Sequence, residues 1–295
     1  MSLSRRHQGK HLSVLKNAGP GCITYYSGLE WAHVEHLQGC TILVREDFSH
    51  VFFPEKEVEC WKVADPQVEF YKLSAAFRED YLDRDDMVQA GGAWVHKDAQ
   101  IGKGVELGLG AVIGACCLEN GVRIGENAVV YAKTKVGSGT SIGASTVIGA
   151  AGMMWVWDGK SKIFLEQLGG VSIGQDCHIG SNITIVRGNA NENTEIGRGT
   201  CIAHGSMIGH GCRLGQNVHL ANSVALGGSV SIGARCFLGS GSAVSPGKTM
   251  VDEVILGAGA VLTESAIKKG VYVGVPAKWK SNASEQMSGV PMWTP

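Results

Sequence analysis

Aliphatic side chains recur at every sixth position over much of this chain. From Ile196 to Leu262, each step of six residues lands on an aliphatic residue or a methionine. Gly or Ala usually follows each of these residues, and a small or β-branched side chain usually lies two positions before it. Residues 101–148 show the same six-residue spacing of aliphatic side chains, with one shift of register by a single residue. A period of six matches neither the 3.6 residues of a helical turn nor the alternation of a plain strand.

The six-residue period predicts a parallel β-helix. Each hexad supplies one short strand and a corner, and three hexads close a triangular coil whose inward side chains stack on those of the next coil. Gly and Ala suit the corners because they relieve the tight backbone there. A Gly-rich low-complexity segment would not hold the aliphatic positions in register. We therefore predict a mainly β fold, with a β-helix domain over residues 92–280 whose handedness the periodicity leaves open.

Two interruptions of the repeat predict loops of functional interest. The first is an inserted loop over residues 149–171, in which Trp155 and Trp157 precede the hairpin turn signal Asp158-Gly159. The two indoles are interpreted either as packing residues or as contacts for an acyl group or substrate. The second interruption is a slip of phase through the segment VRGNANENTE.

The first 88 residues lack the six-residue period. The segments GCITYY and GCTILV are typical of short strands, and Asp65-Pro66 supplies a helix N-cap followed by a proline in the first turn. This helix is predicted to continue to about Leu82. We predict a small α/β domain over residues 1–88, then the polar linker DRDDMVQAGG, and a loosely packed tail over residues 281–295.

Composition narrows the functional classes. The formal net charge is −1 and charged residues make up 18% of the chain, so there is no electrostatic footprint for nucleic acid or an anionic membrane. No apolar run suits a signal peptide or a membrane span. The nine cysteines include no CxxC pair, which favours buried, reduced thiols over a disulfide or zinc framework. We expect a cytoplasmic protein without nucleic-acid partners.

Several strings resemble one enzyme family, the UDP-3-O-acylglucosamine N-acyltransferases of lipid A synthesis. The string AGPGCITYYSGLEW followed by ILVREDF resembles that family's uridine-binding domain. The inserted loop resembles its long loop, and IGSNITIVRG resembles its Asn-Thr-Thr-Ile-Asp-Arg-Gly segment. The string GVPAK also resembles coenzyme-A-dependent acetyltransferases of nucleotide-linked amino sugars. The resemblance implies a left-handed β-helix and a homotrimer with active clefts between subunits.

The resemblance also assigns roles to individual residues. Tyr25 and Trp31 match aromatic positions of the uridine loop, although a half-buried strand tyrosine is an equally good interpretation of Tyr25. Asn182 is the asparagine of the SNITIVRG segment, where it is expected to contact substrate. Arg187, in the same segment, is expected either to bind a phosphate or to hold the Asn-rich loop.

Two histidines are candidates for a general base. The family's base lies in an Ile-Ala-His-Asn string, which the letters IAHG match at His204, whereas spacing in hexads matches IGHG and His210. Because a packed solenoid holds its register firmly, we expect His210 to be the base and keep His204 as the alternative. Stacked corners are 18 residues apart, so Asn222 is expected above His204 and Gly228 above His210. The backbone N–H of Gly228 is a candidate oxyanion donor.

These residues together predict an N-acyltransferase. It would move an acyl group from a thioester, on acyl carrier protein or coenzyme A as co-substrate, to the amine of a nucleotide-activated amino sugar. Imidazole suits removal of the amine proton near neutral pH, and no permanently bound cofactor or metal is expected. One alternative is a zinc hydratase of the carbonic anhydrase type that uses His178, His204, His210 and His219. The other is a non-catalytic scaffold that binds nucleotide-linked sugars.

Overall fold

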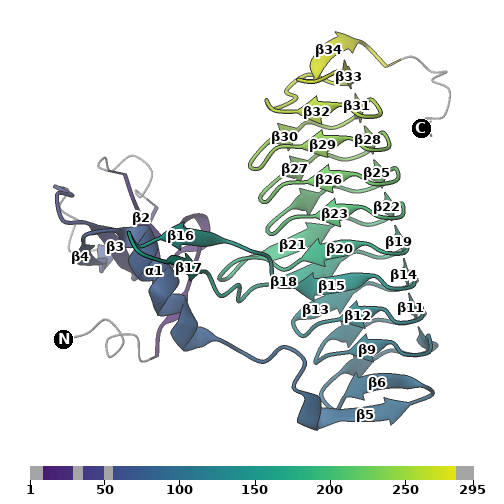
Figure 1. Cartoon of the computed structure of the whole chain (residues 1–295), viewed down its shortest axis with the longest axis horizontal. Coiled ribbons are helices and arrows are strands. Elements are labelled where there is room, and N and C mark those ends of the chain that lie inside the picture. The colour runs from purple at the N-terminus through teal and green to yellow at the C-terminus, as the bar shows by residue number, and fades with distance from the viewer. Residues whose placement is uncertain (1–8, 29–35, 50–55, 284–295) are drawn as a thin grey trace. The chain divides into compact units, whose positions relative to one another are not determined.

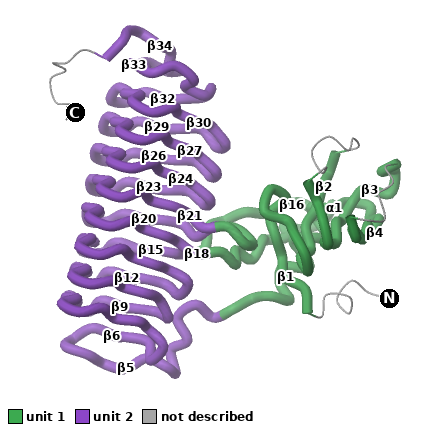
Figure 2. The backbone as a smooth tube through the Cα atoms, turned by 180° about the vertical axis from the view of Figure 1, so that it is seen from behind, with its two compact units in different colours: residues 1–79, 151–169, 189–192 green, residues 80–150, 170–188, 193–295 purple. Residues whose placement is uncertain are grey.

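The chain folds into two compact units (Figure 2). The computed structural model describes residues 9–28, 36–49 and 56–283. Unit 1 is built from residues 1–79, 151–169 and 189–192. Unit 2 is built from residues 80–150, 170–188 and 193–295.

Unit 2 is the β-helix that the six-residue period predicts (Figure 1). Short parallel strands stack with a register of 18 residues where the repeat is regular, so that Ile202 lies opposite Leu220 and Leu220 lies opposite Leu238. From Ile196 to Leu262 the residues at the sixth positions are all buried and belong to one continuous core, whereas Ile101, near one end of the solenoid, is 43% exposed. Removing each such side chain from water contributes roughly 1.5–3 kcal/mol.

The strands of unit 2 form three faces. The first face contains β7 (Gln100–Ile101), β10 (Cys117–Leu118), β13 (Thr134–Val136), β18 (Gly170–Ile173), β21 (Asn193–Ile196), β24 (Arg213–Leu214), β27 (Ser231–Ile232) and β30 (Thr249–Met250). The second contains β8 (Glu106–Leu107), β11 (Arg123–Ile124), β14 (Ser141–Ile142), β19 (His178–Ile179), β22 (Cys201–Ile202), β25 (His219–Leu220), β28 (Phe237–Leu238), β31 (Val254–Leu256), β33 (Gly270–Val273) and β34 (Lys278–Ser281). The third contains β5 (Met87–Ala90), β6 (Ala93–His96), β9 (Val112–Ile113), β12 (Val129–Val130), β15 (Val147–Ala150), β20 (Thr184–Val186), β23 (Met207–Ile208), β26 (Ala225–Leu226), β29 (Ala243–Val244) and β32 (Val261–Leu262).

Both ends of the solenoid are closed by antiparallel pairs. At one end β5 pairs with β6, preceded by the 3₁₀ turn η6 (Arg84–Asp86). At the other end β33 pairs with β34. The segment DRDDMVQAGG is therefore not a linker, because its backbone groups are used by the third face. The tail predicted over residues 281–295 begins at Ser281, which is the last residue of β34. Residues 284–295 lie outside the described part of the chain.

Unit 1 is a small α/β structure, as the sequence predicts. Its parallel sheet has the order β1 (His11–Leu12), β2 (Cys22–Tyr26), β3 (Thr41–Arg45) and β4 (Glu59–Val63), with the 3₁₀ turn η2 (Leu15–Asn17) after β1. Helix α1 (Pro66–Ser74) begins at Asp65, whose carboxylate accepts hydrogen bonds from the N–H groups of Gln67 and Val68. The helix ends at Ser74, earlier than predicted, and passes into the 3₁₀ turn η5 (Ala75–Phe77).

The middle part of each interruption, residues 151–169 and residues 189–192, folds into unit 1. In the first, β16 (Trp155–Trp157) and β17 (Lys162–Phe164) form the predicted hairpin, and the following Leu165 is buried in the unit 1 core. In the second, Asn191 accepts hydrogen bonds from Ser13 Oγ and the Val14 N–H, and buried Glu192 pairs with Lys16 at 2.7 Å. The inserted loop that the sequence assigns to the β-helix domain is thus mostly part of the N-terminal unit.

Candidate active site

The two candidate histidines occupy different corners of one coil. His204 lies in the corner between β22 and β23, and His210 lies in the corner that follows β23. Neither ring enters the aliphatic core: His204 is exposed and His210 is half-buried. The two side chains therefore belong to separate local environments on either side of the third face.

The imidazole of His210 packs directly against Gly228 of the next coil. A Cβ atom added to Gly228 would collide with the ring nitrogen Nε2, so only glycine leaves room for the imidazole at this place. The carbonyl of Gly228 accepts a hydrogen bond from the Gly247 N–H. Its own N–H has no hydrogen-bond acceptor among the described residues. The corner thus brings together an imidazole and a backbone donor, the pair that stacking at 18 residues predicts.

His204 is held by a hydrogen bond to the preceding coil. The Ser181 N–H donates to Nδ1 of His204 at 2.9 Å. An imidazole nitrogen that accepts this bond carries no proton, so the proton of the neutral ring is on Nε2. In this arrangement the outer nitrogen of His204 is a hydrogen-bond donor and has no lone pair with which to take a proton from a substrate. This hydrogen bond therefore argues against His204 as a base.

Asn182 lies at the same corner as His204, one coil earlier. Its backbone has a φ of 55°, in the left-handed region that asparagine adopts more readily than most residues. Its N–H donates to the Ala144 carbonyl at 3.1 Å, and its side chain is exposed. The local requirement for a turn explains an asparagine at this position, and the residue belongs to the corner of His204 rather than to that of His210.

Arg187 is fully buried and serves as a structural clamp. Its Nε donates to the Gly149 carbonyl at 2.7 Å, one terminal nitrogen donates to the Ala132 carbonyl at 3.3 Å, and the guanidinium lies 3.4 Å from the ring centre of Tyr81. With none of its surface accessible to solvent, this guanidinium does not face a ligand. This burial argues against phosphate binding, and these hydrogen bonds join Arg187 to neighbouring coils rather than to the Asn-rich loop.

Replacing Arg187 with alanine is expected to destabilise the protein by about 2–4 kcal/mol, because buried carbonyls lose their donors and a cavity remains. Chemical denaturation of Arg187→Ala would measure this loss. The matched control is Arg198→Ala, whose exposed ion pair with Asp176 contributes roughly 0–1 kcal/mol. If Arg187→Ala kept normal stability and lost affinity for nucleotide-linked sugar, the phosphate interpretation would be the right one.

The predicted base-stacking ring, Tyr25, is half-buried and packs against the core of unit 1. Its ring centre is 4.9 Å from that of Phe70, and burial raises the pKa of its hydroxyl to about 12. Trp31, the second predicted ring, lies outside the described residues. By contrast, Trp155 and Trp157 are 41% and 57% exposed, so neither is a core packing residue.

Several of the remaining histidines lie on the second face. A groove of about 320 Å³ there is lined by His178, Cys201, His204 and His219, but not by His210. Nδ1 of His178 is 3.2 Å from Ser141 Oγ, and burial holds the pKa of His219 below its ordinary value. In the described part of the chain, the four histidines of the zinc hypothesis form no group of three ligand atoms within 4.8 Å.

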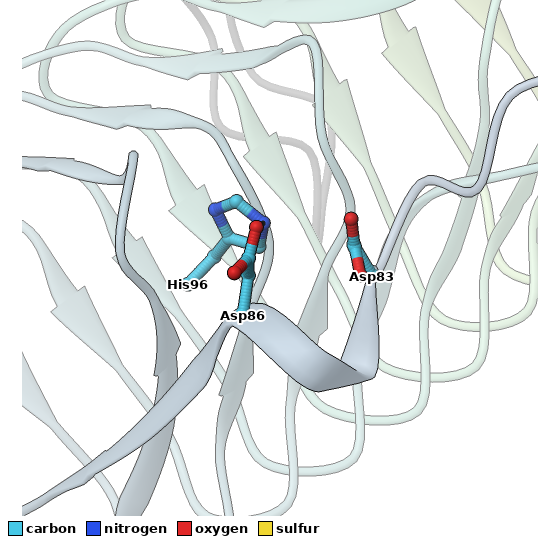
Figure 3. A group of neighbouring side chains, drawn as sticks. All are labelled: Asp83, Asp86 and His96. Carbon is cyan, nitrogen blue, oxygen red and sulfur yellow. Dashed lines mark ion pairs between the residues drawn. The ribbon is translucent and has the colours of Figure 1, made fainter.

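Among the described residues, one group of three potential metal ligands has its ligand atoms within 4.8 Å of one another. It consists of Asp83, Asp86 and His96 (Figure 3). Nδ1 of His96 accepts a hydrogen bond from the Asp98 N–H at 3.1 Å, which requires the proton on Nε2, the nitrogen that faces Asp86 at 4.0 Å. Lys97 already pairs with Asp86 at 2.6 Å. A protonated nitrogen cannot bind a metal ion, so this arrangement does not suit a metal site; Lys97, which follows β6, instead holds Asp86 of η6 through its ion pair and its backbone N–H.

Comparison with known proteins finds the six-residue repeat and a similar acyltransferase. The family model described as the hexapeptide repeat of succinyl-transferase matches residues 166–188 and 229–264. A UDP-3-O-acylglucosamine N-acyltransferase from Bordetella avium is 35% identical over 125 residues, which are 41% of this chain and 34% of that protein. The matched region thus spans about a third of the length of this curated relative. These matches agree with the resemblance seen in the sequence motifs.

Solved structures share the fold. UDP-N-acetylglucosamine acyltransferases from Bacteroides fragilis and Campylobacter jejuni have TM-scores of 0.59, with 21% and 22% identity, and each comparison covers 65% of this chain and 74% of the other. The enzyme from Arabidopsis has a TM-score of 0.52 and 23% identity, covering 66% of this chain and 74% of that one. The chain therefore has the fold of these structures, a left-handed parallel β-helix. The sequence comparisons show similarity to acyltransferases.

One surface feature was not among the sequence predictions. On the third face the outward positions are apolar apart from one threonine; they are Trp94, Val112, Val129, Val147, Thr184, Met207, Ala225, Ala243 and Val261. The outward positions of the first face are mostly polar or charged; they are Gln100, Cys117, Lys135, Ser172, Glu195, Arg213, Ser231 and Thr249. The apolar column is visible in the sequence as the residue before the inward aliphatic in every third hexad.

Among the described residues, no helix is long and apolar enough to cross a bilayer.

Proposed function

We propose that the protein is an N-acyltransferase that transfers an acyl group from a thioester to the amine of a nucleotide-activated amino sugar. The observation that carries this proposal is the packing of the His210 imidazole against Gly228, whose N–H is available to a ligand. The curated relative, which carries the name of an N-acyltransferase acting on a UDP-linked glucosamine, supports the substrate class.

The proposed chemistry needs a base and an oxyanion donor. The acceptor amine attacks the thioester carbonyl, and His210 accepts the proton that the nitrogen loses as the new C–N bond forms. The negative charge that develops on the carbonyl oxygen is stabilised by the Gly228 N–H. The C–S bond then breaks, and the proton held by His210 passes to the departing thiolate. The products are an amide and a free thiol, and no covalent intermediate with the protein is required.

The direct test is a transfer assay with purified protein. Acyl-coenzyme A and acyl carrier protein thioesters would be offered separately with UDP- and dTDP-linked amino sugars, while thiol release and the mass of the sugar product are followed. Formation of an amide that survives mild base supports N-acyl transfer, whereas a base-labile ester would show O-acyl transfer instead. Binding of both substrates without thiol release would identify the protein as a scaffold.

Metal analysis of the purified protein tests the hydratase alternative. Less than stoichiometric zinc is expected, because the described histidines are distributed over separate corners and faces rather than gathered around one point. Stoichiometric zinc with CO₂ hydration activity would replace the acyltransferase proposal.

The apolar column of the third face supports a homotrimer. It continues over nine coils, about 38 Å at roughly 4.8 Å between neighbouring strands. A continuous apolar surface of this length on a soluble protein is typical of an interface. Met207 lies in this column, and His204 and His210 occupy the corners on either side of it. A second copy that covers the third face would therefore border the corner of His210 and form a cleft there.

Placing a charge in this column is expected to dissociate the assembly. We predict that the wild type has about three times the 31.1 kDa mass of one chain, and that Met207→Glu has the mass of one chain, because burying an unpaired carboxylate costs several kcal/mol. Light scattering after size-exclusion chromatography measures both masses. Met207→Leu, which keeps an apolar side chain, should remain trimeric. A trimeric Met207→Glu protein would exclude the third face as the interface.

We also propose a cytoplasmic location. All nine cysteines are free thiols in the structure, which suits a reducing compartment.

A further inference from the structure

The hairpin β16–β17 has one face in the core of unit 1 and one face in solvent. Trp155 lies opposite Phe164, Val156 opposite Ile163, and Trp157 opposite Lys162. The central pair packs against the unit 1 core. The side chains on the other face, which we call the aromatic face, are exposed: Trp155 by 41%, Trp157 by 57%, Phe164 by 53% and, with them, Lys162.

This hairpin is firmly attached, so the exposed rings are not a consequence of fraying. Residue Leu165, which follows β17, is buried, and the Glu166 N–H donates to Ser74 Oγ at 3.0 Å. At the turn, the Asp158 carboxylate accepts hydrogen bonds from two backbone N–H groups, at Lys160 and Ser161. These bonds hold the pKa of the Asp158 carboxyl below its usual value. The aromatic face is therefore a preformed surface.

The chemistry of the aromatic face suits a flat ring joined to an anion. The rings of Trp155 and Trp157 are 5.6 Å apart and nearly perpendicular. The Lys162 ammonium lies 4.4 Å from the centre of the first ring and 5.7 Å from the second. Among the described residues, no carboxylate forms an ion pair with Lys162 or with nearby Lys160. Indole faces stack on nucleobases, and an ammonium without a carboxylate partner attracts phosphate.

We propose that the aromatic face binds the nucleoside diphosphate part of a substrate. The base stacks on Trp157 or Trp155, and Lys162 moves from the indole faces to the diphosphate. This inference rests on the proposed function, and it moves base recognition from Tyr25, which is packed against Phe70, to the inserted hairpin. A nucleoside diphosphate is part of both a nucleotide-linked sugar and coenzyme A, so the experiment includes both sources.

Calorimetric titration of the full-length protein with UDP, uridine and coenzyme A tests the proposal. Trp157→Ala is expected to weaken UDP and uridine binding by about 5- to 100-fold, because both ligands lose the stacking surface. Lys162→Gln is expected to weaken UDP by roughly 3- to 10-fold and to leave uridine unchanged, because only UDP carries phosphates. Trp157→Phe retains an aromatic ring and should bind nearly as the wild type does.

Two controls keep the result interpretable. Trp94→Ala removes an exposed tryptophan from β6 of unit 2 and should bind all three ligands as the wild type does. Circular dichroism and thermal unfolding of Trp157→Ala should match the wild type, since this side chain lies on the solvent side of the hairpin. If the variant unfolds, Trp155→Ala and Lys162→Gln supply the same comparison.

The outcomes distinguish this proposal from the proposed function. Wild-type affinity for UDP and coenzyme A in Trp157→Ala, Trp155→Ala and Lys162→Gln alike would overturn the aromatic face as the site and leave the acyltransferase proposal standing. A wild-type protein that binds neither UDP nor coenzyme A would contradict the proposed function itself. Loss of coenzyme A binding alone would support the site and assign it to the acyl donor. Binding to phosphatidylglycerol vesicles that depends on Trp157, with unchanged nucleotide affinity, would show that the face contacts lipid and overturn the proposal.

Discussion

Replacing His210 with alanine is expected to lower kcat for acyl transfer by about 10²–10⁴-fold, the usual contribution of a general base. The affinity for nucleotide-linked sugar should change little, because the ring takes part in the transition state rather than in ground-state binding. The structural reason is the position of His210 against Gly228, whose N–H has no hydrogen-bond acceptor among the described residues. Steady-state kinetics with direct titration of the sugar would measure both quantities.

The matched control for this prediction is His204→Ala. Because Nδ1 of His204 accepts the Ser181 N–H, its outer nitrogen is protonated, and its loss should lower kcat by less than about tenfold. A pattern in which His204→Ala removes activity and His210→Ala does not would show that the letters of the IAHG string, rather than the spacing of hexads, identify the base. Circular dichroism of both variants should match the wild type, since neither ring is in the core.

Gly228→Ala is expected to lower kcat by about 10²-fold although the change adds a single methyl group. The new Cβ would occupy the space of the His210 imidazole, so the ring must turn away from the cleft. A displacement of a catalytic group by about 1 Å can cost this much activity. The Gly228 backbone does not adopt a left-handed φ, so alanine is compatible with the chain and the β-helix should remain folded.

A double-mutant cycle separates this effect from general damage. If the methyl group acts by displacing His210, adding Gly228→Ala to His210→Ala should lower kcat little further. Gly19→Ala is a neutral control, because a Cβ there meets no other atom and its φ is negative or extended. Two independent, additive losses would instead indicate that Gly228 acts through its own N–H alone.

Much of the solenoid follows directly from the sequence. A step of six residues places one aliphatic side chain inside each strand, and three steps place Gly228 beside His210 without any knowledge of coordinates. The N-cap at Asp65 and the strands around Cys22 and Thr41 are also local features, and the structure contains each of them. Such features were predictable because each depends on a few neighbouring residues, or on a hydrophobic pattern that is weak in one hexad but recurs in many.

Other features depend on which distant segments pack together. The pattern of residues 155–164 predicts a hairpin, but it does not reveal that Val156 and Ile163 face the core of unit 1 while the indoles face solvent. Arg187 carries a charge that suggests a phosphate ligand until the structure shows it enclosed by carbonyls and the Tyr81 ring. In each case the side chain's role is decided by partners far away in the chain.

The sequence by itself thus determined the β-helix, its register and the neighbours of each corner residue, because a periodic chain repeats one local packing solution. Only the tertiary structure decided that one ring nitrogen of His204 is already occupied, since that depends on a hydrogen bond from Ser181 on another coil. It also decided that the middle part of each interruption belongs to the N-terminal unit, where its apolar and polar groups find partners.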